Sequence, residues 1–392
     1  MNILYIHQYF KTPNEGGAIR SWYIAKGMLS AGHQVQIITA HNNSKYEQKL
    51  IDGLKVHYLP VSYCNNYGFF RRLFSFLFFA HKAYYLSRKF EDIDLAYITS
   101  TPLTVGLTAL KLKKKKNIPY IFEVRDLWPE APIQMGIIKS KIIKTISRKL
   151  ESHIYKNAKK IVALSPGIED FVKKMVPGKN VLLCPNMADC DFFNQYDPVS
   201  DSLKKEHNLG GSFVISYFGA IGWVNALDYY LNLANVCMNK GLDIKFFIIG
   251  SGGQESRLIR KAEEMQLDNL FFIGHISKKE LKKYLSITDA AYISFANYPI
   301  LEYNSPNKFF DSLASGKLVV SNVKGWIREI IEDHSCGIYI NPEKPEDFIP
   351  MITPIMKDSE LLKKYQDNAR NLAENSFERK KLVQELLTYI ES

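Results

Sequence analysis

Short apolar runs alternate with longer amphipathic stretches along the chain, and this pattern predicts strands that alternate with helices. In the first half, predicted strands cover residues 3–7, 34–39, 56–60, 95–99, 120–123 and 161–164, and predicted helices include residues 18–31 and 104–114. A strand–helix–strand rhythm is typical of a parallel sheet that is covered by helices. The first half is therefore predicted to be one α/β domain.

The rhythm breaks over residues 184–211, which are polar, and then starts again. Predicted strands follow at 214–218, 244–250, 270–273, 290–293 and 318–321, with predicted helices at 227–239, 254–265, 278–285 and 307–314. We expect two Rossmann-like domains, over residues 1–190 and 191–375, followed by a C-terminal segment 376–392 whose helix could pack back on the first domain. Ligands of such sheets bind beyond the carboxyl ends of the strands, so two facing domains would enclose a cleft.

Length and composition exclude several classes of protein. A chain of 392 residues suggests two or three domains, and 46% hydrophobic with 23% charged residues is an ordinary globular composition. The five cysteines are scattered without a C-x-x-C pair, which disfavours disulfides and structural zinc. No signal-peptide pattern and no run of 18 uncharged apolar residues is present. We therefore expect a cytoplasmic protein.

Positive charge is concentrated in the first half of the chain. Residues 1–190 carry 28 Lys and Arg against 13 Asp and Glu, whereas the remaining residues carry 23 against 27. Residues 67–90 (YGFFRRLFSFLFFAHKAYYLSRKF) place cations around an aromatic centre, as in a helix that lies in the headgroup layer of a membrane. The residues expected to dock on an anionic membrane are Arg71, Arg72, Phe74, Phe78 and Phe79. The alternative is a buried helix of the α/β layer; nucleic acid is not expected, because no recognised binding motif is present.

Two glycines precede the first predicted helix. Gly16 and Gly17 would let the backbone approach an anion at the start of that helix. A tight strand-to-helix turn explains them equally well. The segment lacks the full G-x-G-x-x-G pattern, which counts against an ordinary dinucleotide site.

A charged segment follows the strand predicted at 120–123. Residues 122–130 (FEVRDLWPE) hold three acids and one arginine, and burying these without a role would be costly. Asp126 is the candidate for contacting a substrate hydroxyl or easing proton transfer, and Trp128 could stack on a sugar or close the core. The alternative is a salt-bridged loop in which Arg125 neutralises a neighbouring acid.

Glycines also end two predicted strands of the second half. Gly219 and Gly222 follow the first of these strands, and Gly250 and Gly252 follow the second. Either turn could present backbone N–H groups to phosphate, and either could be an ordinary strand-to-helix connection.

Residues 302–317 (EYNSPNKFFDSLASGK) are the most informative segment. Ser305 is expected to cap a helix and Pro306 to occupy its first position. The free N–H groups of that turn, together with Lys308, would attract an anion. Asp311 lies one turn further on the same face and could accept ribose hydroxyls. The alternative is a capped helix with a local Lys308–Asp311 pair.

Together these motifs resemble a retaining GT-B glycosyltransferase of glycosyltransferase family 4. The branch that the sequence is most similar to comprises amino-sugar (L-fucosamine-like) transferases of bacterial surface polysaccharide assembly. The resemblance covers nearly the whole chain, and residues 305–317 are its most specific part. It rests on the Gly16-Gly17 loop and on residues 125–130, 185–186, 250–252 and 305–317.

The resemblance implies that the second domain binds a nucleotide sugar and the first domain binds the acceptor. The implied donor-binding residues are Gly16, Gly17, Gly219, Gly222, Gly252, His275, Ile276, Ser305, Pro306, Asn307, Lys308 and Asp311, with Glu302 and Tyr303 near the donor sugar. The implied acceptor-binding residues are Arg125, Asp126 and Trp128, and the implied catalytic residues are Asp126 and Lys308. No metal or cofactor is expected, because cations and helix ends would neutralise the leaving diphosphate.

The sequence departs from the family pattern at two places. The family commonly carries two glutamates eight positions apart, whereas here Tyr303 and Asp311 occupy these positions and Glu302 is out of register. The family also commonly has an Arg and a Lys after the first strand of the second domain, whereas residues 222–228 (GWVNALD) contain no cation. We expect Lys308 to supply the missing charge.

The implied reaction moves a sugar, an N-acetylated amino or deoxy-amino hexose, from a UDP-sugar to a polyprenyl-diphosphate-linked saccharide with retention. Such a step belongs to O-antigen or capsule assembly at the inner leaflet of the plasma membrane. A covalent route needs a carboxylate beside the anomeric carbon. No residue is a secure candidate, so the departing diphosphate is expected to take the acceptor proton.

Three alternatives remain open. They are a UDP-sugar 2-epimerase-like GT-B enzyme, a non-catalytic scaffold that binds a nucleotide sugar, and an NAD-dependent oxidoreductase. The last is disfavoured by the missing G-x-G-x-x-G.

Overall fold

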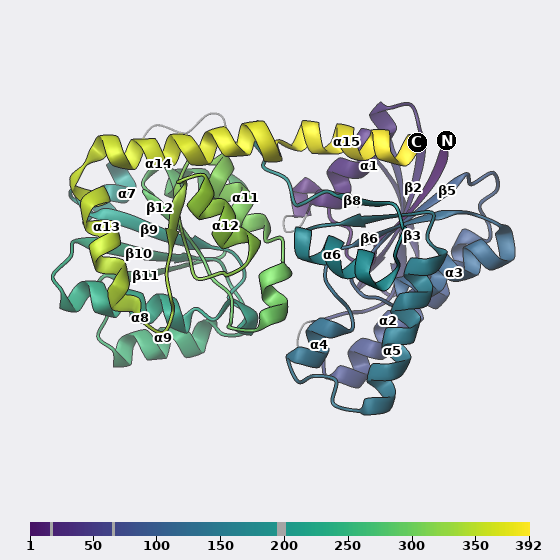
Figure 1. The fold of residues 1–392 in the computed structure, drawn as a ribbon, viewed down its shortest axis with the longest axis horizontal. Coiled ribbons are helices and arrows are strands. Elements are labelled where there is room, and N and C mark those ends of the chain that lie inside the picture. The colour runs from purple at the N-terminus through teal and green to yellow at the C-terminus, as the bar shows by residue number, and fades with distance from the viewer. Residues whose placement is uncertain (16–18, 65–66, 194–200) are drawn as a thin grey trace. The chain divides into compact units, whose positions relative to one another are not determined.

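The computed structural model of the chain describes residues 1–15, 19–64, 67–193 and 201–392. They form two compact units, of which the first comprises Met1–Pro185, Tyr303–Ser305 and Lys380–Ser392, and the second comprises Asn186–Glu302 and Pro306–Arg379. The first boundary lies at the start of the polar stretch, and most of the last helix belongs to the first unit. Both units are α/β (Figure 1).

The described residues of the first unit form an eight-stranded sheet in the order β3-β4-β2-β1-β5-β6-β7-β8. All neighbours are parallel except β3, which pairs antiparallel with β4. The strands are β1 (Asn2–Ile6), β2 (Gln34–His41), β3 (Glu47–Ile51), β4 (Leu54–Pro60), β5 (Leu95–Thr99), β6 (Tyr120–Val124), β7 (Lys160–Ala163) and β8 (Val181–Leu183). Every residue of β5 and β6 is buried, as is typical of central parallel strands with helices on both faces.

Helices cover both faces of the first sheet, with α1 and α15 on one side and α2, α3 and α5 on the other (Figure 1). The helices are α1 (Arg20–Ser30), α2 (Phe69–Ser87), α3 (Val105–Lys116), α4 (Glu130–Gln134), α5 (Lys141–Asn157), α6 (Pro166–Met175) and α15 (Arg379–Glu391). Close packing joins α15 to this unit: a Cβ on Gly27 of α1 would lie 2.3 Å from Cγ1 of Val383.

The described residues of the second unit form a six-stranded, fully parallel sheet in the order β11-β10-β9-β12-β13-β14. The strands are β9 (Phe213–Phe218), β10 (Ile244–Ile249), β11 (Leu270–Gly274), β12 (Ala290–Ile293), β13 (Leu318–Ser321) and β14 (Gly337–Tyr339). The helices are α7 (Asp201–Glu206), α8 (Asp228–Asn239), α9 (Glu255–Glu264), α10 (Lys278–Ser286), α11 (Asn307–Ala314), α12 (Trp326–Asp333), α13 (Phe348–Lys357) and α14 (Ser359–Leu372). Two separate buried clusters lie on the two faces of this sheet, one shared with α8, α9 and α13 and the other with α10, α11, α12 and α14.

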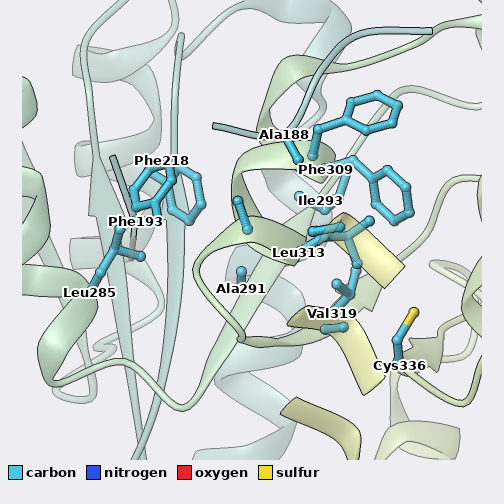
Figure 2. Close-up of a cluster of buried hydrophobic side chains, with 14 of the residues drawn as sticks. Ala188, Phe193, Phe218, Leu285, Ala291, Ile293, Phe309, Leu313, Val319 and Cys336 are labelled. Carbon is cyan, nitrogen blue, oxygen red and sulfur yellow. The ribbon is translucent and has the colours of Figure 1, made fainter. Parts of the chain in front are cut away.

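The second of these clusters anchors α11. Phe309 and Leu313 of α11 are fully buried in it together with Phe218 of β9 and Ile293 of β12 (Figure 2). A buried aromatic side chain removes a large apolar area from water and so contributes strongly to stability. This packing fixes the start of α11, and with it Lys308, at the carboxyl edge of the sheet.

Candidate functional site

The helix α11 has the predicted bounds, but its N-cap differs by one residue from the expected one. Pro306 is the N-cap, with φ −75° and ψ 125°, and the helix begins at Asn307. The prediction that Ser305 caps the helix and that Pro306 is its first residue is therefore wrong, because the carbonyl of Pro306 accepts the first helical bond, from the N–H of Phe309 at 3.0 Å. The N–H groups of Asn307 and Lys308 precede that bond and have no partner within the helix. They leave a helix start that attracts anions.

The ammonium of Lys308 lies beside the glycine turn that follows β9. Its Nζ donates a hydrogen bond to the hydroxyl of Tyr217 at 2.7 Å. A second bond, at 2.9 Å, runs to the side-chain oxygen of Asn225 when that amide is turned so that its nitrogen donates to the carbonyl of Ala220. A Cβ on Gly219 would lie only 3.5 Å from the same Nζ. Burial lowers the pKa of Lys308 to about 7.

The glycines of this edge are required mainly because two turns pack against each other. Gly219 and Gly250 have φ values of 147° and 145°, and a Cβ on Gly250 would lie 1.9 Å from the carbonyl oxygen of Gly219. The N–H of Gly219 donates to Ile249 and that of Gly250 to Gly274, so neither is available to phosphate. In the described part of the chain, the N–H groups of Gly222 and Gly252 donate to no protein acceptor.

Asp311 is half-buried one turn beyond Lys308, and the two do not pair. Burial raises the pKa of Asp311 to about 7; the charge of Lys278 opposes this shift, that of Asp189 adds to it and that of Arg379 opposes it. These three residues form ion pairs, since Asp189 contacts Lys278 at 3.0 Å and Arg379 at 2.5 Å. Among the residues described, no ion pair joins Lys308 to Asp311, so the alternative of a local pair is wrong. The two groups are free to contact different parts of one ligand.

The remaining predicted donor residues are more scattered. His275 is exposed just after β11, and Ile276 packs against the cluster that anchors α11. Glu302 is half-buried in a 3₁₀ turn, Pro299–Tyr303. Tyr303 and Ser305 belong to the first unit. Of these three residues, only Glu302 lies in the second unit, which also contains Lys308. Gly16 and Gly17 lie outside the described residues.

In the first unit, the acid at the end of β6 is neutralised by a residue that the sequence analysis did not single out. Arg20 Nε contacts Glu123 Oε1 at 2.9 Å, and the Tyr97 hydroxyl donates to the same oxygen at 3.1 Å. Arg20 also donates to the carbonyl of Cys184 at 3.0 Å. The alternative of a loop in which Arg125 neutralises a neighbouring acid is therefore wrong for Glu123, whose partner is Arg20. Arg20 and Glu123 are 103 positions apart, and only the parallel sheet brings them together.

The other predicted residues of this loop lie at the carboxyl end of β6, as expected. Asp126 is half-buried and accepts a hydrogen bond from the Thr101 hydroxyl at 3.0 Å. The backbone N–H of Arg125 donates to the Ser100 hydroxyl at 3.0 Å. Trp128 packs edge-on against Phe76 of α2, with ring centroids 6.3 Å apart.

α2 is amphipathic, and the predicted docking set needs one correction. Phe79 is completely buried, because it lies on the face of α2 that packs inward. Phe74 and Phe78 are exposed, as is Arg71, and Arg72 is half-buried. Phe70, which the sequence analysis missed, is 81% exposed and precedes Phe74 by one helical turn, a spacing that could have indicated it. No helix in the described ranges combines the length and apolar character needed to cross a bilayer.

Comparison with known proteins matches both halves of the chain. Residues 15–192 match the family model described as Glycosyltransferase Family 4, and residues 199–372 match the model described as Glycosyl transferases group 1. WbjE of Pseudomonas aeruginosa, described as a glycosyltransferase, is 23% identical over 268 residues, which is 67% of this chain and 66% of WbjE. WcaI of Escherichia coli K12, whose name assigns it to colanic acid biosynthesis, is 21% identical over 386 residues, 93% of each chain.

Solved structures share the fold. A structure of HepE from Anabaena in complex with UDP and glucose superposes with a TM-score of 0.70 at 15% identity, covering 100% of both chains. Likeness at this level of identity shows the architecture alone. Because the two family models together match most of the chain, residues 15–192 and 199–372, the protein is a GT-B glycosyltransferase of the family 4 type.

Proposed function

We propose that this glycosyltransferase moves an N-acetylated amino or deoxy-amino hexose from a UDP-sugar to a polyprenyl-diphosphate-linked saccharide, with retention and without a metal. The step would serve O-antigen or capsule assembly. The observation that carries the donor half of this proposal is the position of Lys308. Its ammonium lies at a glycine turn and on the first turn of α11, where helix N–H groups also attract an anion.

A diphosphate and a ribose fit the two titratable groups of α11. The diphosphate would accept hydrogen bonds from Lys308 and from the N–H groups of Asn307 and Lys308. The ribose hydroxyls would donate to Asp311. Positive charge stabilises the diphosphate as it departs from the sugar. The departing diphosphate would then take the acceptor proton on the same face of the sugar. HepE, whose structure contains UDP and glucose, supports the choice of a UDP-sugar.

Binding of the donor is expected to change the protonation of both groups, with opposite signs. The pKa values of Lys308 and Asp311 are both about 7 without ligand. A bound diphosphate raises the pKa of Lys308, so the complex takes up a proton above pH 7. Ribose hydroxyls lower the pKa of Asp311, so the complex releases a proton below pH 7. Calorimetry of UDP-sugar binding in buffers of different ionisation enthalpy measures both.

The expected result is net uptake at pH 8 and net release at pH 6. Lys308→Met should abolish the uptake and Asp311→Asn the release. A proton count of zero at both pH values would contradict this assignment of the donor contacts.

The first unit is proposed to bind the acceptor. Its positive charge suits a lipid-linked diphosphate, and Asp126 lies at the carboxyl end of β6, where ligands of such sheets bind. Phe70, Phe74 and Phe78 would enter the headgroup layer of the inner leaflet while Arg71 contacts lipid phosphates.

Changing Phe70 and Phe74 to serine together is expected to weaken binding to vesicles of phosphatidylcholine and phosphatidylglycerol at least tenfold. Each exposed phenylalanine contributes about 2 kcal/mol when it is buried in lipid. Sedimentation with vesicles at low salt measures the change. Tyr46→Ser, which removes an exposed aromatic ring beside β3, is the matched control and should leave vesicle binding unchanged. Equal vesicle binding by the double variant and the wild type would contradict a docking role for α2.

A screen of UDP- and GDP-sugars with a polyprenyl-diphosphate-sugar acceptor, read by mass spectrometry, tests the whole proposal. Transfer to the acceptor is the expected result, and NMR of the new linkage reports retention. A sugar changed in the absence of acceptor would instead indicate an epimerase. Binding of UDP without turnover of any donor would indicate a scaffold.

A further inference from the structure

Lys308 is held from two sides by residues of the segment that begins with β9. Tyr217 is the fifth residue of β9, and Asn225 ends a 3₁₀ turn, Trp223–Asn225, that follows the strand. Their oxygen atoms lie 2.7 Å and 2.9 Å from the Lys308 ammonium. Both side chains also donate to one carbonyl, that of Ala220, at 2.6 Å and 2.8 Å. This shared acceptor fixes their orientation relative to the glycine turn.

The hydrogen-bond count leaves room for a ligand. An ammonium group has three N–H donors. Among the residues that the structure describes, Tyr217 and Asn225 accept two of them. The third is available to an anion that approaches the first turn of α11.

Such an arrangement matters because a lysine side chain is flexible. Ordering a free lysine costs side-chain entropy, which a ligand would otherwise have to offset on binding. A cation that is already in place also acts on developing charge without reorganisation. The pair of Tyr217 and Asn225, called the clamp from here on, holds the ammonium without a second positive charge, since the segment 222–228 contains none.

We propose that Tyr217 and Asn225 are positioning residues that hold the Lys308 ammonium over the glycine turn, where it meets the diphosphate of the donor. This inference rests on the proposed function, because it assumes that Lys308 binds that diphosphate. It adds that donor binding depends on where the positive charge lies in the site, and not on which residue carries it. A cation introduced at position 225 should therefore replace the one at 308.

Moving the charge tests this inference. Lys308→Ala is expected to lower the affinity for a UDP-sugar at least tenfold in calorimetry. Adding Asn225→Lys to it should recover at least a third of that loss on a logarithmic scale, because lysine extends further than asparagine toward the vacated position. The matched control adds Asn239→Lys, which places the same charge on an exposed position at the far end of α8 and should recover nothing.

Two outcomes separate the inference from the proposed function. If Lys308→Ala leaves UDP-sugar affinity unchanged, the proposed donor site itself is wrong. If affinity falls but the lysine at 225 recovers no more than the lysine at 239, the donor site stands and the claim that the place of the charge determines donor binding is wrong.

A second measurement covers the case in which the double variant does not fold. Tyr217→Phe and Asn225→Ala each remove one acceptor from the ammonium, so the charged form of Lys308 becomes less stable and its pKa falls. UDP-sugar affinity should then decline with rising pH at least half a pH unit earlier than in the wild type, with far-ultraviolet circular dichroism unchanged. An unchanged pH profile in both variants would overturn the clamp.

Discussion

Lys308→Met is expected to lower kcat/KM for the donor at least 100-fold and, at the same time, to make the protein more stable. The loss follows because a positioned cation is removed from the site of developing negative charge, and one such contact is worth about 100- to 1,000-fold in rate. The gain follows because the pKa of Lys308 is about 7 in the folded protein, well below the ordinary 10.5 of an unfolded chain.

The sign of the stability change follows from that depressed pKa. Between pH 7 and 10.5, folding releases a proton from Lys308. In this range the free energy of unfolding therefore falls by about 1.4 kcal/mol for each unit by which the pH decreases. At pH 8 the lysine therefore costs about 3 kcal/mol, which methionine removes. The gain should shrink as the pH approaches 10. Steady-state kinetics and thermal unfolding at pH 8 and 10 measure the two effects.

Lys317→Met is the matched control for this variant. Lys317 lies between α11 and β13, and burial lowers its pKa to about 8, with the charge of Asp289 opposing the shift. It lies outside the candidate donor site, so kcat/KM should stay within a few-fold of the wild type. A Lys308→Met enzyme that is less stable but equally active would show that the lysine is structural.

Arg20→Met is expected to destabilise the first unit by about 3–5 kcal/mol, because Glu123 would be left charged and buried without its partner. Arg125→Met, at the half-buried residue that directly follows β6, should cost less than about 1 kcal/mol, because Arg125 forms no ion pair among the described residues. Hydrogen exchange of the β6 amides, which reports opening of this unit, measures both.

A double variant at Arg20 and Glu123 shows whether the loss of stability comes from the unpaired charge or from the lost packing of the Arg20 side chain. When Glu123→Met accompanies Arg20→Met, no buried charge is left, and most of the stability should return. Equal losses in Arg20→Met and Arg125→Met would contradict the assignment of Arg20 as the partner of Glu123.

The sequence predicted the central strands and helices because their patterns are local. β5, β12, β13 and α11 have the predicted bounds, and both units are α/β as expected. Three of the four edge strands, β3, β8 and β14, were missed for a physical reason. β3 is polar and mostly exposed, and β8 and β14 have three residues each, too few to show a period.

The sequence predicted which segment carries the candidate site, but not which side chains from other segments contact it. Lys308 and Asp311 could be singled out because a helix start and its charges are close in sequence. Tyr217, Asn225 and Arg20 could not, because a hydroxyl, an amide and a lone arginine acquire their partners only when distant strands pair. Phe79 was assigned to the exposed face because the aromatic run 74–79 does not by itself show which side of α2 packs inward.

We propose that the start of α11, with Lys308 and Asp311, binds the nucleotide half of an activated sugar. A crystal structure of the protein with UDP is the decisive experiment. The diphosphate is expected within hydrogen-bond distance of the Lys308 ammonium and of the N–H groups of Asn307 and Lys308, with the ribose at Asp311. UDP bound away from both side chains, or no UDP at saturating concentration, would contradict it.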